Sequence, residues 1–258
     1  MAHTKFPKLS DYILYQDEYV LILNKPAGVS SLKDRNEPEQ TDLLALIRKT
    51  YPEAQLCHRL DKATSGVIIA ALNQDVYRAI ALQFQERKIT KYYYTLIAGR
   101  HLFDRVQVEA AISIQRNGLV RIDINRGKEA TTIFDSVEFF NDYTLVRCEP
   151  ITGKQHQIRI HLAYLQCPII GDTDYGGVDI FLSKLKKRYH LDRNLEKEHP
   201  LNHHFLLHAG AITFEHPVKQ ELMTCEAPFP KHFDAVLKVL RKYNPLPASH
   251  HPQTTQKQ

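Results

Sequence analysis

The sequence predicts an α+β domain, and three observations lead to this class. Short segments that alternate apolar and polar residues follow one another in the middle of the chain, with tight polar turns between them, as in an antiparallel sheet. These segments cover residues 106–114, 119–124, 130–140 and 143–148. Apolar residues recur at helical spacing in 43–51, 73–88 and 229–243. No internal repeat or linker-like stretch divides the 258 residues, so one α+β domain is the simplest organisation.

The N-terminal part of the chain predicts a hairpin and a buried strand. Residues 1–10 are expected to form a loose arm. Residues 12–15 and 20–23 are apolar and enclose a polar turn, which predicts two antiparallel strands. Residues 67–72 are apolar throughout and rich in β-branched side chains, which is typical of a strand buried on both faces.

Polar residues that cap helices stand before two of the helical segments. Thr41 or Asp42 is expected to cap the helix at 43–51, because short oxygen-bearing side chains accept bonds from the free N–H groups of a first turn. Asn73 or Asp75 is expected to do the same for the next helix.

The second half of the chain predicts further strands and leaves one segment open. A strand is expected at 91–98, and two more at 206–214 and 221–225. Residues 155–165 fit both a strand and a helix, because their apolar residues match both periods. Residues 244–258 are rich in Pro, Gln and His and are expected to be a disordered tail.

Composition is that of an ordinary soluble globular protein with a moderately basic balance. The net charge is +5 and the isoelectric point is near 8.9, which permits a polyanionic partner without requiring one. No apolar run reaches the length of a membrane span, and the first residues lack the apolar core of a signal peptide. The expected location is therefore the cytoplasm, without membrane attachment.

Cysteine and histidine spacing gives little support to a disulfide framework or a metal site. The four cysteines are scattered without a Cys-x-x-Cys pair and are expected to be reduced and partly buried. His199, His203 and His204 could bind a metal by spacing, but Pro200 between them favours an irregular loop.

The first candidate site is the loop from His58 to Gly66, which leads into the buried strand. It carries Arg59 and Asp61 to the edge of a rigid core, where catalytic groups are commonly held. From this segment alone, the favoured interpretation is a polar turn in which Asp61 and Ser65 bond only to local backbone.

The second candidate is Lys91 with Tyr93 in the tyrosine-rich strand. Tyr93 is expected to point away from Tyr92 and Tyr94, because side chains alternate along a strand. Tyrosines in strands are often half-buried packing residues, so this segment alone does not define a site.

The third candidate, residues 152–162, combines the donors Lys154, His156 and Arg159. It is not a phosphate-binding P-loop, because Gln155 stands where that motif needs Ser or Thr. The donors would suit a carboxylate or phosphates, or they could line a polar helix face. A fourth segment, 170–177, is rich in turn residues and could line a cleft or simply reverse the chain.

Taken together, these segments resemble the RluA-type RNA pseudouridine synthases over residues 11 to about 230. Six motifs occur in the family's order, which is far more specific than any one of them. They are Asn24-Lys25-Pro26-x-Gly28, His58-Arg59-Leu60-Asp61 with Thr64-Ser65-Gly66, Lys91-x-Tyr93, Thr152-Gly153-Lys154-x-His156-Gln157-Ile158-Arg159, Pro168-Ile169-x-Gly171-Asp172 with Tyr175-Gly176, and Leu207-His208-Ala209.

The resemblance implies the pseudouridine synthase fold in a catalytic domain at 11–243. This fold is a mixed, mainly antiparallel bent sheet flanked by helices, with an active cleft that crosses the sheet. The family converts uridine to pseudouridine in structured ribosomal or transfer RNA, with no cofactor or metal. It implies that Asp61 is the catalytic carboxylate, as nucleophile or base, and that Arg159 pairs with it. Tyr93 would stack on the uracil, and Arg59 would fill the place of the flipped nucleotide.

The remaining expectations concern RNA contacts and domain content. Lys91, Lys154 and His156 are expected to contact RNA, and Thr64 and Ser65 only to shape the loop. Lys154 stands where the family often has Arg. The chain begins close to the catalytic domain, so we expect no S4 RNA-binding domain, and a monomer is expected.

The charged segment 178–204 is longer than is usual between its flanking motifs. Its cluster from Lys184 to Arg188 is either an insertion that contacts RNA or a solvated helix face. A non-catalytic RNA-binding protein on the same scaffold is the alternative function, and the co-occurrence of Asp61, Tyr93 and Arg159 argues against it. An Asp-dependent nuclease or glycosidase is less supported, because no second carboxylate has a clear partnering motif.

Overall fold

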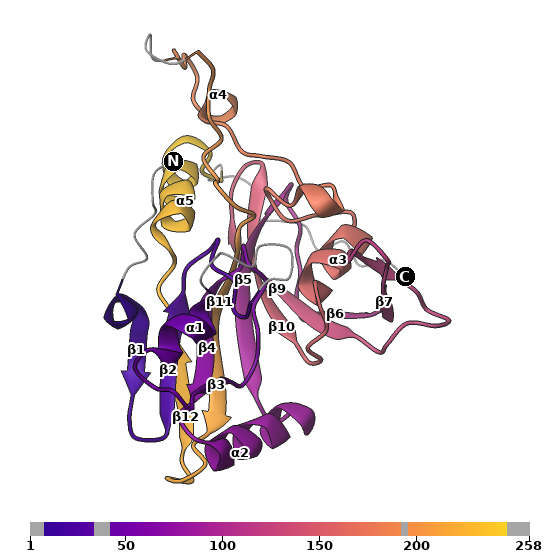
Figure 1. The fold of residues 1–258 in the computed structure, drawn as a ribbon. Coiled ribbons are helices and arrows are strands. Elements are labelled where there is room, and N and C mark those ends of the chain that lie inside the picture. The colour runs from indigo at the N-terminus through magenta and orange to yellow at the C-terminus, as the bar shows by residue number, and fades with distance from the viewer. Residues whose placement is uncertain (1–7, 34–41, 192–195, 247–258) are drawn as a thin grey trace. The chain divides into compact units, whose positions relative to one another are not determined.

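The computed structural model describes residues 8–33, 42–191 and 196–246, and within them the chain divides into two compact units. The first unit comprises Met1–Lys91 and Ala209–Pro228, and the second comprises Tyr92–His208 and Phe229–Gln258. Strands form the centre of both units and helices pack beside them (Figure 1), so the predicted α+β class is confirmed. No helix among these residues is long and apolar enough to cross a membrane.

The first unit is built on strands that run in the order β1, β2, β4 and β11. The predicted hairpin is present, because β1 and β2 pair antiparallel, and β2 pairs antiparallel with β4 in turn. The short strand β3 also pairs with β4, and β12 pairs with β11. The bounds are β1 Ile13–Gln16, β2 Val20–Lys25, β3 Gln55–Leu56, β4 Ser65–Ala71, β11 Leu207–Glu215 and β12 Leu222–Glu226.

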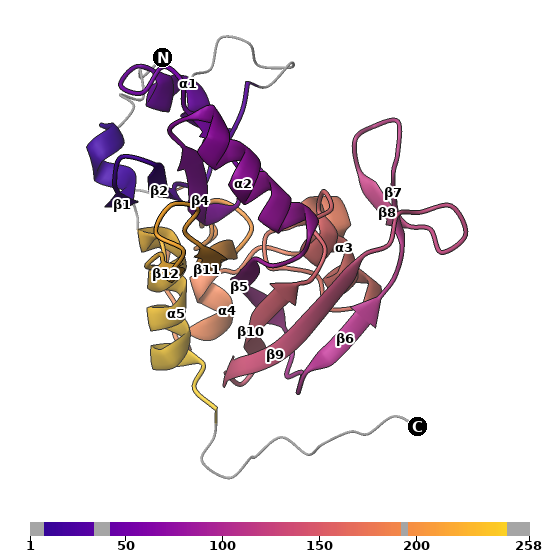
Figure 2. The same cartoon turned by 90° about the horizontal axis from the view of Figure 1, so that it is seen from below.

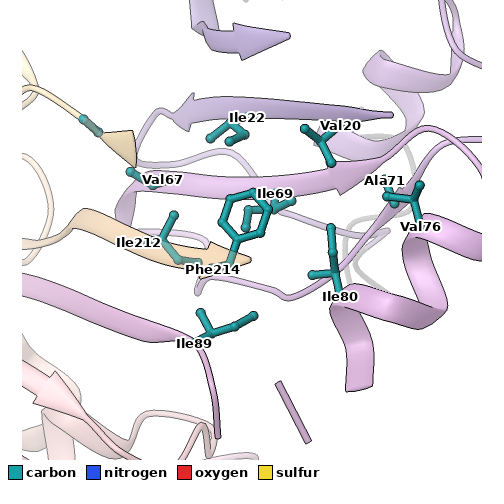
Figure 3. Close-up of a cluster of buried hydrophobic side chains, with 11 residues drawn as sticks. Val20, Ile22, Val67, Ile69, Ala71, Val76, Ile80, Ile89, Ile212 and Phe214 are labelled. Atoms are coloured by element: carbon teal, nitrogen blue, oxygen red, sulfur yellow. The ribbon is translucent and has the colours of Figure 1, made fainter. Parts of the chain in front are cut away.

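The core of the first unit lies between this sheet and helix α2 (Gln74–Gln85). Every residue of β4 is buried, as its apolar composition predicts. Val76 and Ile80 stand one helical turn apart on α2 and point toward Ile69 of β4 and Phe214 of β11 (Figure 3). Burial of a side chain of this size stabilises the fold by about 1.5–3 kcal/mol, so this cluster fixes β4 firmly.

Both predicted helix starts in the first unit are confirmed. The Asp42 side chain accepts a bond of 2.8 Å from the N–H of Ala45 and caps α1 (Leu43–Arg48). The Asn73 side chain accepts one of 2.9 Å from the N–H of Val76 and caps α2. Each cap satisfies a donor that the first helical turn leaves without a backbone partner.

The second unit contains an antiparallel sheet in the order β5, β10, β9 and β6 (Figure 2). The segment predicted as one strand at 106–114 is two, because β6 ends before Ala110 and β7 pairs with β8 in a separate hairpin. The bounds are β5 Thr90–Ala98, β6 Val106–Glu109, β7 Ile112–Ile114, β8 Val120–Ile122, β9 Thr131–Phe139 and β10 Tyr143–Pro150.

The segment that fits both periods is a helix, α3 (Gln157–Tyr164). Ile158 and Leu162 lie one turn apart and are both buried in the core formed with β5, β9 and β10. Helix α5 (Lys231–Tyr243) follows its prediction closely, and it buries Phe233, Val236, Leu237 and Leu240 on one face. The remaining helical turns are η1 Leu9–Tyr12, η2 Thr173–Tyr175 and α4 Leu182–Leu185.

Asn244, where the disordered tail was expected to begin, is buried. Its side chain accepts a bond from the N–H of Asp142 and donates one of 2.6 Å to the Asp142 carboxylate. Residues 247–258 lie outside the described residues, as does most of the predicted arm at 1–10, so both predictions stay predictions.

Candidate active site

Neighbouring residues in the loop that carries Asp61 differ in their exposure to solvent. Leu60 is buried, Asp61 is half-buried and Arg59 is exposed. The N–H of Thr64 donates to the carbonyl of Asp61 at 3.0 Å, which closes a turn just before β4 begins. The loop therefore holds the half-buried carboxylate of Asp61 just before β4 and leaves the side chain of Arg59 exposed.

Lys25, at the end of β2, ties this loop to the turn that follows β2. Its side chain is fully buried. The ammonium donates to three carbonyl oxygens, those of Pro26 at 3.0 Å, Val29 at 2.7 Å and Lys62 at 3.2 Å. Three acceptors match the three N–H bonds of an ammonium, so its hydrogen-bonding capacity is satisfied without water.

Two further contacts join the same segments. The hydroxyl of Ser31 donates to the carbonyl of Leu60 at 2.8 Å and accepts from the N–H of the same residue at 3.1 Å. The N–H of Gly28 donates to the carbonyl of Lys62 at 2.8 Å. The backbone on either side of Asp61 is therefore held by buried polar contacts from the Pro26–Ser31 segment.

The electrostatics of this loop are dominated by the buried ammonium. Burial lowers the pKa of Lys25 to about 7, although the nearby carboxylate of Asp61 acts in the opposite direction.

His58, the first residue of the loop, packs beside Phe84, and Lys91 contacts the same ring. The Nε2 atom of His58 accepts a bond of 3.1 Å from the N–H of Ile69, and its ring lies 5.0 Å from that of Phe84. Burial, assisted by the nearby Lys91 ammonium, lowers the pKa of His58 to about 3. Burial also lowers the pKa of Lys91 to about 8, and its ammonium lies 5.9 Å from the centre of the Phe84 ring. His58 is thus a neutral structural acceptor at physiological pH.

Gly66 is required where β4 leaves the loop. Its φ is +114°, and a Cβ atom there would lie 2.1 Å from the carbonyl oxygen of Ala209. Only glycine permits both the backbone angle and this close approach. The Thr-Ser-Gly part of the motif is thereby explained by geometry, and Thr64 and Ser65 are buried within it.

In the second unit, Tyr93 lies on β5 opposite Cys148 of β10. Its side chain packs against the cluster that contains Ile158 and Leu162, whereas Tyr94 packs against the separate cluster around α5. Tyr93 therefore lies on the opposite face of the strand from Tyr94, as the alternation predicts.

Arg159 is held by a buried ion pair with Asp172. Its Nε and Nη2 atoms donate to the two oxygens of Asp172 at 2.7 and 2.6 Å, and Nη2 also donates to Asp174 at 2.7 Å. The side chains of Arg159 and Asp172 are only 4% and 1% exposed, while that of Asp174 is 51% exposed. The two-pronged geometry fixes the plane of the guanidinium.

Two aromatic rings complete the surroundings of Arg159. Its guanidinium carbon lies 4.4 Å from the centre of the Phe205 ring and 4.8 Å from that of Tyr175. Such contacts favour a cation that is already removed from water. The same Tyr175 hydroxyl accepts a bond from the N–H of Val120 and lies 2.8 Å from Nδ1 of His156.

The loop at 170–177 positions Asp172 by close backbone packing. A Cβ atom on Gly177 would lie 2.0 Å from the carbonyl oxygen of Ile169 and 2.7 Å from the amide nitrogen of Asp172. The N–H of Gly177 donates to the carbonyl of Asp172 at 2.7 Å. This turn-rich segment therefore does more than reverse the chain, because it supplies the partner of Arg159.

Gln157 organises the start of α3. Its buried amide oxygen accepts from the Thr152 hydroxyl at 2.7 Å and from the N–H of Lys154 at 3.0 Å. Its amide nitrogen donates to the carbonyl of Thr131 and the hydroxyl of Thr132. The amide oxygen thus holds the loop that precedes α3, and the amide nitrogen joins α3 to β9.

A profile of the RNA pseudouridylate synthase family matches residues 19–164, more than half of the chain, and this range includes Asp61, Tyr93 and Arg159. The chain belongs to this family. The resemblance predicted from six motifs is confirmed, and the protein is an RNA pseudouridine synthase, an isomerase that acts on uridine in RNA.

Curated relatives support the same assignment over most of the chain. The ribosomal large subunit pseudouridine synthase C of Vibrio vulnificus (strain CMCP6) is 34% identical over 249 residues, which are 92% of this chain and 71% of the relative. The protein of the same name from Escherichia coli (strain K12) is 34% identical over 244 residues, which are 92% of this chain and 72% of the relative.

Solved structures show the same fold. Human RNA Pseudouridylate Synthase Domain Containing 4 superposes with a TM-score of 0.71 at 24% identity, over 90% of this chain and 94% of that chain. Human RNA Pseudouridylate Synthase Domain Containing 1 gives a TM-score of 0.64 at 24% identity, over 94% of this chain and 96% of the other. The predicted pseudouridine synthase fold is therefore confirmed.

The predicted site residues of this synthase fall into two groups. Arg59, Asp61 and Lys91 belong to the first unit, whereas Tyr93, Lys154, His156 and Arg159 belong to the second. Lys154 is exposed and His156 is half-buried at the start of α3. The predicted pairing of Arg159 with Asp61 would join the two groups and stays a prediction. Among the described residues, no three His, Cys, Asp or Glu side chains are placed to hold a metal ion.

Three residues of the synthase to which no role was assigned from the sequence are central to the site. Lys25, Asp172 and Gln157 all lie in motifs of the family, but each has at least one side-chain partner more than ten residues away in the sequence. A signal existed for each, because Lys, Asp and Gln next to turn residues are seldom buried unless they are hydrogen-bonded. That signal marks a buried polar residue without naming its partner.

Proposed function

We propose that this synthase converts specific uridines of large-subunit ribosomal RNA into pseudouridine, with Asp61 as the catalytic carboxylate. The RNA class is supported by the relatives, which are named ribosomal large subunit pseudouridine synthases and align with 92% of the chain. The observation that carries the role of Asp61 is its loop, which Lys25, Ser31 and Gly28 hold through the backbone on both sides of it.

The reaction rearranges one nucleotide without net oxidation or reduction. The bond between ribose C1′ and uracil N1 breaks, the base rotates, and C1′ bonds to C5. The proton of C5 is released and N1 gains a proton, so atoms and electrons balance. The protein must therefore hold a charged intermediate, allow the base to turn, and move protons.

In this proposal Asp61 acts in its ionised form, as nucleophile or as base. Lys25 keeps the loop in place and adds a positive charge behind it. In this proposal Arg159 pairs with Asp61, and Asp172 and Asp174, which accept from its Nε and Nη2 atoms, fix the plane of its guanidinium. A charge-assisted contact of this kind contributes about 1.5–3 kcal/mol.

The remaining predicted residues act on the RNA. Arg59 is exposed at the tip of the loop and enters the stack where the target nucleotide has left it. Tyr93 stacks on the displaced uracil and assists the loss of the C5 proton. Lys91, Lys154 and His156 contact the RNA around the target. We further propose that the synthase works as a monomer in the cytoplasm, which sedimentation of the purified chain and fractionation of its host would check.

Tritium release tests the proposal. Large-subunit RNA transcribed with tritium at C5 of uridine should release label into water with the full chain, and Asp61→Asn should reduce the rate by at least 10³-fold. Glu53→Gln removes an exposed carboxylate from the same unit and should leave the rate unchanged. Absence of release with the wild-type chain would sink the proposed RNA, and normal release by Asp61→Asn would sink the role of Asp61.

A further inference from the structure

A cluster of exposed cations follows α4 in the second unit. Lys184, Lys186, Lys187 and Arg188 are all exposed, and the stretch 182–191 contains no carboxylate. One carboxylate approaches from outside the stretch, because Glu198 bonds to the N–H of Ser183 and lies near Lys184. Lys186, Lys187 and Arg188 have no carboxylate within ion-pair distance in the part of the chain that the structure describes.

The stretch is fixed to α5 by a buried anchor. Leu185 is buried together with Val236, Leu237 and Leu240, which are side chains on the inner face of α5. The exposed cations on either side of Leu185 therefore have a defined position on the surface of the second unit, where α4 contacts α5. A solvated loop would not require such an anchor.

The end of α5 adds a cation at the same place. The ammonium of Lys186 lies 5.9 Å from the centre of the Tyr243 ring, and that of Lys242 lies 5.1 Å from the same ring. One half-buried aromatic ring thus brings together cations from two elements that are more than 50 positions apart in the sequence.

Other cations of α5 are already neutralised. Arg241 makes two bonds, of 2.9 and 2.8 Å, to the carboxylate of Glu138. Lys238 lies 2.6 Å from the carboxylate of Asp234. The helix C-terminus itself favours nearby cations, which accounts for Lys242 but not for Lys186 to Arg188, which lie outside α5. The unbalanced charge is therefore a property of the surface that the two elements form together.

We infer that Lys186, Lys187, Arg188 and Lys242 form a surface that binds the phosphate backbone of the substrate RNA. This basic surface carries four exposed positive charges that no carboxylate among the described residues pairs with, and phosphate contacts release condensed counterions. Lysines contact phosphates as point charges and need no fixed geometry, which fits their exposure. The inference deepens the proposed function and rests on RNA being the substrate.

Salt-dependent binding tests the inference. The probe is an unmodified transcript of large-subunit RNA, and the protein is the full chain with Asp61→Asn, which keeps the RNA unconverted. Lys186→Gln, Lys187→Gln and Lys242→Gln together should make the slope of log Kd against log salt shallower by about 2, since each phosphate contact contributes about 0.7–0.9. The affinity at 0.1 M salt should fall by roughly tenfold.

Two matched controls accompany the triple variant. Lys→Arg at the same three positions keeps the charges and should retain the wild-type slope. Lys8→Gln, Lys49→Gln and Arg100→Gln remove three exposed cations from other segments and should change the affinity by less than about threefold. A wild-type slope in the triple Gln variant, or an equal loss in the spread control, would overturn the inference.

A second measurement separates this inference from the proposed function. In the tritium-release assay with Asp61 intact, the triple Gln variant should raise KM by about tenfold, while the loss in kcat stays small. Normal release with an unchanged KM would overturn the surface and leave the function standing. Absence of release by the wild type, with the salt effect present, would overturn the function and leave the surface standing.

Discussion

Arg159 shows how this synthase keeps a charge inside its second unit. A buried guanidinium is costly unless it is paired and hydrogen-bonded. Asp172 accepts two bonds at a position that is itself buried, Asp174 accepts one at the surface, and the ring centres of Phe205 and Tyr175 lie 4.4 and 4.8 Å from the guanidinium carbon. The position of Arg159 therefore depends mainly on Asp172, the buried carboxylate.

The two carboxylates make a matched pair of variants. Asp172→Asn should lower the free energy of unfolding by about 3–5 kcal/mol, because it leaves a buried charge without its main partner. Asp174→Asn removes an exposed partner and should cost about 0–1 kcal/mol. Urea unfolding of both variants measures the difference, and equal losses would show that burial does not decide the value of the pair.

At the scale of elements, the end of β4 depends on a glycine. Gly66 combines a φ of +114° with a neighbouring carbonyl that would lie 2.1 Å from any Cβ atom. Gly176 also has a positive φ, of +88°, but no atom lies within 4 Å of the place where its Cβ would stand. Substituting each of the two glycines therefore distinguishes the cost of backbone strain from the cost of steric overlap.

Gly66→Ala should destabilise the synthase by more than about 3 kcal/mol. The new Cβ atom would force the buried strand β4 or its neighbour to move, and residue 66 would also keep an unfavourable φ. Gly176→Ala should cost only about 1–2 kcal/mol, the strain of a left-handed residue with a Cβ atom. Thermal unfolding checks this, since about 1 kcal/mol corresponds to roughly 2–4 °C in Tm for a chain of this size. A variant of Gly66 as stable as that of Gly176 would contradict the steric argument.

On the scale of the whole molecule, buried basic groups make stability depend on pH. His58 has a native pKa of about 3, below its ordinary value of 6.5. Between these values the unfolded chain binds a proton that the native chain does not, so stability falls as pH falls. The contribution of His58 is complete above pH 6.5 and is lost as pH approaches 3.

Replacing His58 should therefore flatten the acid side of the stability curve. His58→Gln keeps an acceptor for the N–H of Ile69 but cannot titrate. Between pH 7 and pH 4.5, wild-type stability should fall by about 2 kcal/mol more than that of the variant. His199→Gln, at an exposed position, should leave the wild-type slope intact. Parallel curves for wild type and His58→Gln, measured by urea unfolding at each pH, would refute this.

Lys25 also makes stability increase with pH, but over a higher pH range than His58. Its native pKa of about 7 lies below the ordinary value of 10.5, so the cost of burying its charge is present below pH 7 and is relieved as pH rises toward 10.5. Below pH 7 the fold therefore holds a charged lysine next to Asp61 at an energetic cost. That cost is consistent with a functional role for the charge.

The sequence by itself determined most of the elements, the helix caps at Asp42 and Asn73, and the family. These follow from local patterns, because a period of 2 or 3.6 and a capping side chain act over a few residues. The motifs also identified Asp61, Tyr93 and Arg159 as candidate catalytic residues. For one segment, 155–165, both periods fit, and only the shared core with β5, β9 and β10 decided for a helix.

Tertiary structure alone decided which partners hold the site. Lys25 meets the carbonyl of Lys62 across 37 residues, and Arg159 meets Asp172 across 13. Such pairs depend on how the chain closes upon itself, and a buried polar side chain announces the need for a partner without naming it. The fold thus supplied what the motifs could not: the buried lysine behind Asp61 and the buried carboxylate that directs Arg159.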